Sequence, residues 1–64
     1  MKLRELKKGA WFTLKPIPSP APSQVWIRGD YDRTDRRYSA INWEDMNRER
    51  LLSGDREVFV DFTF

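Results

Sequence analysis

The chain of 64 residues contains neither cysteine nor histidine. The lack of cysteine excludes a disulfide framework and a thiolate zinc site, and the lack of histidine excludes acid/base chemistry by an imidazole. No apolar run is long enough for a membrane span or a secretory signal, so we expect a cytoplasmic location by default. No cofactor motif is present either, and we predict no cofactor.

A strong charge of either sign is also absent, because 12 basic and 10 acidic side chains leave a net charge of +2. This small excess permits contact with nucleic acid without demanding it. Aromatic side chains are what the chain does have, at 14% of its residues. Each of them can bury about 150 to 250 Å². We therefore expect one small domain, residues 1–64, with an aromatic core and no cross-links.

Two strand-like runs between residues 24 and 43 predict a central β-hairpin. In the first run Val25 and Ile27 alternate with their neighbours, which predicts that both are buried and that Trp26 points outward. The second run is RRYSAINW, and the aspartates between the two runs favour a turn. These aspartates lack the glycine and the distal glutamate of a calcium loop, so we predict no metal site.

Two further runs show the same alternation. Residues 10–15 predict a first strand with Phe12 and Leu14 facing inward and Trp11 facing outward. Residues 57–64 have the clearest alternation in the chain and predict a last strand, with an inward face made of Val58, Val60 and Phe62.

Proline marks the segment between the first strand and the hairpin. Residues 16–23 read PIPSPAPS, and a proline at every second position predicts an exposed, extended loop. The segment contains no P-x-x-P, the spacing that proline-recognising grooves require, so we favour a loop over a peptide ligand. Before the first strand, Leu3 and Leu6 predict a helical turn that ends near Gly9.

Residues 43–53 fit two local structures. Asn42 as a cap, acidic residues at 44 and 45 and Arg48 near the end are helix signals. The apolar residues fit a period of 3.6 only loosely, which favours a turn or a single helical turn near residues 44–48 and then a short strand to Leu52. A helix over residues 43–50 stays open.

These elements predict a mainly β fold of four or five short strands joined by short connections. The fold class that fits is a small antiparallel barrel, SH3-like or OB-like, since closure hides the sheet edges.

Four segments of the chain carry a resemblance: L-x-x-L-K-x-G-x-x-F at residues 3–12, V-W-I-R-G-D-Y-D-R at 25–33, R-Y-S at 37–39 and L-x-G-D-R-E-V-F-V-D-F at 52–62. Together they resemble a group of very short uncharacterised proteins of gut Bacteroidales and of related phage and mobile-element genomes. The resemblance implies a small β-barrel and a mobile-element context, and it supplies no catalytic residues.

Aromatic residues interleaved with arginine form the candidate binding surface, because outward rings stack on bases or anchor protein interfaces. Its members are Trp11, Trp26, Arg28, Tyr31, Arg33, Arg36 and Arg37. A structural alternative is a cross-strand pair of Trp11 with Trp26.

We predict a small non-enzymatic binding module, a protein-interaction or homodimerising domain without catalytic residues or membrane contact. The alternative is an accessory protein of a phage or mobile element that binds single-stranded nucleic acid through this aromatic and arginine face.

Overall fold

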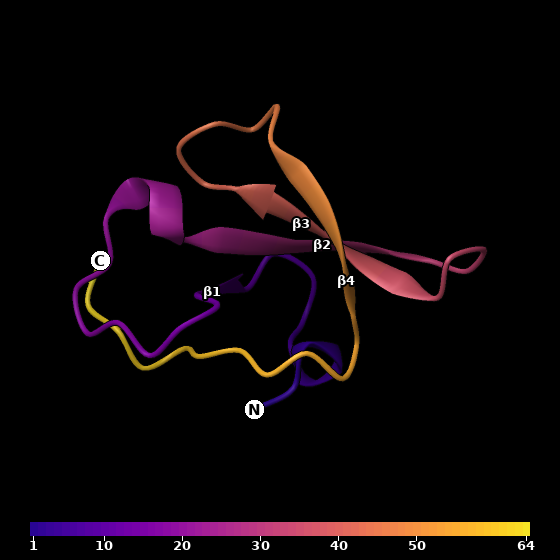
Figure 1. Cartoon of the computed structure of the whole chain (residues 1–64), viewed down its shortest axis with the longest axis horizontal. Helices are drawn as coiled ribbons and strands as arrows, with labels where there is room; N and C mark the ends of the chain where they lie inside the picture. Colours follow the sequence, from indigo (N-terminus) through magenta and orange to yellow (C-terminus); the bar gives the residue numbers. More distant parts are fainter.

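The computed structural model describes all 64 residues and is mainly β, as the sequence predicts. Its four strands form one open antiparallel sheet in the order β1-β2-β3-β4 (Figure 1). The strands are β1 (Trp11–Phe12), β2 (Trp26–Asp32), β3 (Arg37–Asn42) and β4 (Glu49–Ser53). The helical segments are two 3-10 turns, η1 (Leu3–Glu5) and η2 (Pro22–Gln24). Neither is long enough to cross a membrane.

The central hairpin is formed by β2 and β3, which confirms the sequence prediction. At its tip a carboxylate oxygen of Asp32 accepts the backbone N–H groups of Thr34 and Asp35, at 2.9 and 3.3 Å. This is the turn-forming use of aspartate that the sequence indicates.

The pairing of the hairpin strands shifts partway along. Arg28 lies opposite Ala40, whereas Tyr31 lies opposite Tyr38. Three steps along β2 therefore match two steps along β3, so β2 carries one extra residue, a β-bulge.

The core lies on one side of the sheet, which we call the core face. Its buried residues are Leu3, Phe12, Trp26, Ala40, Leu52 and Val58, and Leu6, Leu14 and Tyr38 pack against them. The inward prediction is thus confirmed for Phe12 and Val58, while Leu14 is half-buried. The opposite side, the outer face, carries Trp11, Ile27, Ile41 and Leu51.

The predicted outward position of Trp26 is wrong, since its side chain is only 5% exposed. Trp26 lies opposite Phe12 and so shares its face, and Ile27 takes the outer face opposite Trp11. Val25 is buried as predicted, but it caps η2 ahead of the strand and is not part of the core cluster. Trp26 and Ile27 do point to opposite faces, as predicted, but the two faces are exchanged. The larger Trp side chain fills the core of this small sheet, and Ile27 is left on the outer face.

The predicted last strand is also wrong. Residues 57–64 form no strand, and only isolated bridges join Glu57 to Lys2 and Phe59 to Thr13. The Phe62 N–H donates to the Val60 carbonyl at 3.1 Å, a contact across two residues that breaks the extended alternation. Val60 is consequently exposed, and Phe62 is only half-buried.

Residues 43–48 form bends and a turn instead of a helix, and β4 begins at Glu49. The favoured alternative of a turn followed by a strand is therefore confirmed. Asn42, which is fully buried, organises the turn: its Oδ1 accepts the N–H groups of Glu44 and Asp45, both at 3.1 Å. Its Nδ2 donates to the Ser23 carbonyl at 2.9 Å, so all of these polar groups are used inside the fold.

The proline-rich segment is mostly exposed, as predicted, with Pro20 as its buried residue, but its end is not extended, because Pro22 and Ser23 belong to η2. The last residues of the chain run beside this segment (Figure 1), and the Thr63 N–H donates to the Pro18 carbonyl at 2.9 Å. The segment is thus held at two points, through Pro18 and through the bond from Asn42 to Ser23.

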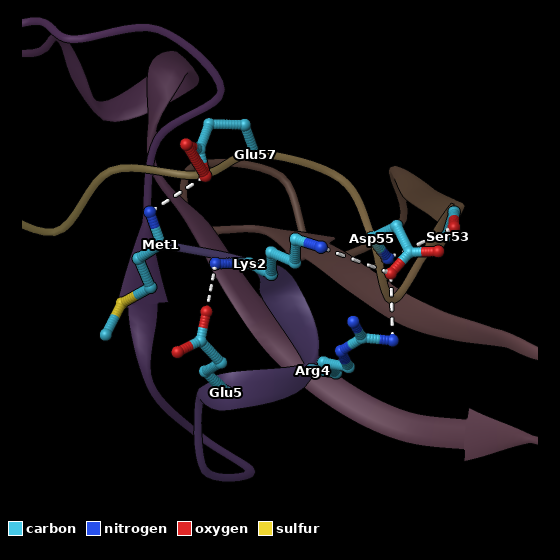
Figure 2. A network of polar contacts seen from close by, with 7 residues as sticks. All are labelled: Met1, Lys2, Arg4, Glu5, Ser53, Asp55 and Glu57. Atoms are coloured by element: carbon cyan, nitrogen blue, oxygen red, sulfur yellow. Dashed lines mark hydrogen bonds and ion pairs between the residues drawn. The ribbon is translucent and has the colours of Figure 1, made fainter.

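The first residues form the predicted turn, with Leu3 buried and Gly9 at a φ of 90° that favours glycine. Figure 2 shows how polar groups join this turn to the residues that follow β4. Arg4 forms an ion pair with Asp55 at 2.8 Å, and the Met1 amino group donates to Glu57 at 2.8 Å. Both ion pairs are exposed and contribute little to stability, so the buried Leu3 and the backbone bonds hold the segment.

Candidate functional site

The structure divides the predicted binding surface among three places. Trp26 lies in the core, beneath the guanidinium groups of Arg48 and Arg50, which are each 5.9 Å from its ring centroid. Arg28 is half-buried on the core face, 4.2 Å above the Tyr38 ring, and its Nη1 donates to the Gly29 carbonyl. Neither Trp26 nor Arg28 is presented to a partner.

The second place is the tip of the hairpin, where Tyr31, Arg33, Arg36 and Arg37 are all exposed. The Tyr31 ring packs against Tyr38 with centroids 4.8 Å apart. Tyr31, Tyr38 and Arg36 line a hollow of about 220 Å³, the tip hollow, together with Arg4, Ser53, Gly54 and Asp55. Four of the seven predicted site residues therefore lie at the tip, but only Tyr31 and Arg36 line the tip hollow. Arg33 lines a separate hollow at the side of the hairpin, and Arg37, next to Tyr38 in β3, points to the outer face.

The third place is the far end of the sheet, where Trp11 is 45% exposed and points outward as predicted. Trp11 does not pair with Trp26. Its ring meets those of Trp43 and Phe64 edge to face, with centroids 6.1 and 5.6 Å away, and Trp43 and Phe64 are 4.9 Å apart. These three residues form the aromatic cluster.

Three separate segments build the aromatic cluster. Trp11 is in β1, and Trp43 directly follows β3, where its N–H donates to the Val25 carbonyl at 2.9 Å. Phe64 follows Thr63, which is bonded to the proline-rich segment. Trp43 and Phe64 remain 40% and 45% exposed, so the cluster presents ring surface to solvent. Apolar surface continues along the outer face through the half-buried Ile27 and Ile41.

Sequence reasoning missed Trp43 and Phe64 as members of a surface. The available signal was the alternation along the run RRYSAINW, which puts Trp43 on the face of Ile41, and in the structure this is the outer face. No local pattern could place Phe64, because its position depends on the path of residues 57–64 beside the proline-rich segment.

A wider hollow of about 500 Å³ lies at the side of the hairpin, with Lys8, Asp30, Glu49 and Leu51 in its wall. The Lys8 ammonium group contacts Asp30 at 2.7 Å. This hydrogen bond, and the positive charge of Lys8, lower the pKa of Asp30 below its ordinary value. Both groups are exposed, so the pair resembles an ordinary surface ion pair more than a catalytic dyad.

No group of three or more Asp, Glu, His or Cys side chains is placed to hold a metal ion. Comparison of the chain with protein-family models, with curated proteins and with solved structures found no match.

Proposed function

We propose that the protein is a small non-enzymatic binding module that recognises another protein through the aromatic cluster. The observation that carries this proposal is the contact of three aromatic rings from distant segments, each 40% to 45% exposed. Tryptophan anchors are the side chains that most often dominate the energy of protein interfaces.

The cluster suits a rigid binding surface. Trp43 is held by the backbone bond to Val25, and the rings support one another, so little side-chain freedom is lost when a partner binds. No charged side chain separates the three rings, and the neighbouring Ile27 and Ile41 extend the apolar surface. The partner class that fits is a protein with an apolar, aromatic-accepting pocket.

The test compares two variants, Trp11→Ala and Trp43→Ala, with the wild type. A matched control is Met46→Ala, which removes an exposed apolar side chain outside the cluster. Partners captured by tagged wild type are identified by mass spectrometry and titrated calorimetrically. We expect each Trp variant to lose roughly tenfold or more in affinity, about 1.4 kcal/mol, and the control to bind normally. Equal affinity of all four proteins would exclude the cluster as the interface.

The second candidate function is binding of single-stranded nucleic acid at the hairpin tip. It is favoured by the tip hollow, in which Tyr31 offers an exposed ring beside Arg36. Bases stack on such rings while guanidinium groups meet phosphates. A mobile-element context, implied by the resemblance in sequence, agrees with this function. Against it, Asp55 also lines the hollow and already pairs with Arg4.

Salt dependence separates the two functions. Oligonucleotide affinity is measured by fluorescence anisotropy at low and moderate salt for wild type, Tyr31→Ala and Arg36→Ala, with Trp43→Ala as control. Nucleic-acid binding requires a steep loss with salt and a further loss in the two tip variants. No binding at low salt would exclude the nucleic-acid function and leave protein interaction as the remaining candidate.

We further infer that the sheet belongs to the small-barrel class, SH3-like or OB-like. Support comes from the paired backbone bonds between Thr13 and Phe59, at 2.9 and 3.0 Å, which place residues after β4 beside the outer edge of β1. Such pairing shields an edge strand, as barrel closure does.

A further inference from the structure

The outer edge of β4 carries backbone groups without partners in the chain. The Asn42 N–H donates to the Arg48 carbonyl, and this bond fixes which residues of β4 point their backbone toward β3. Because hydrogen-bonded and non-hydrogen-bonded pairs alternate, Arg50 and Leu52 also face β3, while Glu49 and Leu51 face away. At the other side of the sheet, Thr13, which directly follows β1, is bonded to Phe59 instead.

Charged side chains that point outward from an edge strand usually prevent another strand from pairing with it. In β4 these side chains point back onto their own sheet. Glu49 accepts a hydrogen bond from the Ser39 hydroxyl at 2.8 Å. The guanidinium groups of Arg48 and Arg50 lie over the Trp26 ring. Leu51, at the middle of the strand, is exposed. The edge therefore lacks the outward charges that prevent strand addition.

We propose that β4 pairs antiparallel with β4 of a second copy of this chain, so that two sheets join into one. This interface is separate from the aromatic cluster and does not depend on the proposed function. The edge supplies the hydrogen bonds, as in other cases of strand addition.

Charge selects one register for this pairing. A two-fold axis at Leu51 places Leu51 opposite itself, Glu49 opposite Ser53 and Arg50 opposite Leu52. No like charges then face each other, and the backbone groups that point outward meet across the interface.

The neighbouring registers are unfavourable. An axis at Arg50 sets two arginines opposite each other, and an axis at Glu49 sets two glutamates opposite each other. An axis at Leu52 brings Arg50 and Glu49 opposite Gly54 and Asp55, which lie in the turn after β4, so the two strands would pair only from Leu51 to Ser53. Like charges directly opposed across a strand pair are destabilising, so the strand is complementary to itself in one alignment only.

Single cysteines test the register directly, because the chain has none of its own. In Leu51→Cys the two Cα atoms would lie about 5.5 Å apart, within disulfide range. In the control Ser53→Cys, on the same face and edge, they would be four residues apart along the strand, roughly 13 Å. We expect the first variant to form an interchain disulfide about tenfold faster or more, in a folded protein. Equal rates in the two folded variants overturn the proposal.

Sedimentation at rising concentration, up to the millimolar range, tests the association itself. Leu51→Pro removes an N–H that points away from β3, so the sheet of the monomer keeps its bonds. We expect the wild type and the control Leu51→Val to dimerise and Leu51→Pro to stay monomeric with an unchanged circular dichroism spectrum. Trp43→Ala should still dimerise. A wild type that remains monomeric, or a proline variant that dimerises equally, overturns the proposal.

Discussion

Trp26 and Trp43 occupy neighbouring positions at one end of the sheet and have opposite environments. Trp26 faces the core and is 5% exposed, and Trp43 faces outward and is 40% exposed. The core side is covered by the N-terminal turn through Leu3 and by Val58, whereas on the outer side Trp43 meets the rings of two similarly exposed neighbours. Alternation divides side chains between two faces, but distant segments decide which face becomes the core.

Replacing the two tryptophans tests this contrast most strongly. Trp26→Ala removes a fully packed ring and should cost about 3 to 5 kcal/mol, enough to unfold most of so small a protein. Trp43→Ala loses about 0.5 to 1.5 kcal/mol of ring contacts and should stay folded. Urea denaturation followed by circular dichroism measures both. Similar losses in the two variants would mean that the outer face is a second core.

Replacing Asn42 tests whether a buried, hydrogen-bonded polar side chain on the core face stabilises the protein as much as a buried apolar one. Asn42→Ala leaves the N–H groups of Glu44 and Asp45 and the Ser23 carbonyl without their partner. Since each such bond contributes about 1 kcal/mol, we expect a loss of about 2 to 4 kcal/mol by the same measurement. Asn47→Ala is the control, because it removes an exposed amide side chain of the same turn that makes no hydrogen bond. An Asn42→Ala variant as stable as the Asn47→Ala variant would contradict this account of the turn.

The two valines after β4 extend the comparison to a segment without regular structure. Val58 is fully buried and Val60 is exposed, although the sequence places them on one face. We expect Val58→Ala to cost about 1 to 3 kcal/mol and Val60→Ala less than about 0.5 kcal/mol. Thermal unfolding of both variants provides the measurement. A loss of stability in Val60→Ala larger than this estimate would mean that Val60 is buried, as the predicted strand over residues 57–64 requires.

The smallest expected effect concerns the exposed ion pair between Lys8 and Asp30. The lowered pKa of Asp30 means that its carboxylate favours the folded state above the unfolded pKa, and this contribution is lost as pH falls through the folded pKa. Lys8→Met should raise the pKa of Asp30 toward its ordinary value and leave stability at neutral pH almost unchanged. Carboxyl-carbon NMR titration detects the shift. An unchanged Asp30 titration in this variant would exclude Lys8 as its cause.

Local signals in the sequence were sufficient for several elements. Turn-forming aspartates flanked by two strand-like runs located the hairpin, and the loose apolar spacing of residues 43–53 favoured the turn and strand that the structure contains. Phe12 and Trp11 were placed on the correct faces, because Phe12 alternates with the apolar Leu14, whereas Trp11 alternates with the polar Thr13 and Lys15.

Non-local packing explains the errors. The phase of β2 could not be read from its own residues, since Val25 and Ile27 suit a core as well as Trp26 does. Residues 57–64 alternate like a strand, but a strand also needs a continuous partner, and here only single bridges form. The aromatic cluster joins residues from three distant parts of the chain, so no window of sequence contains it.

The extra residue in β2 controls the direction of the hairpin tip. Before the bulge the even-numbered residues of β2 face the core, and after it the odd-numbered residues do. For this reason Trp26, Arg28 and Tyr31 share a face. Deleting one residue at position 29 or 30 would remove the bulge and leave Tyr31 opposite Tyr38, because Arg28 and Tyr31 would then be two residues apart, as Ala40 and Tyr38 are. The tip would keep its two surfaces but lose the local bend and added twist of the bulge, so the tip would point in a different direction relative to the rest of the sheet.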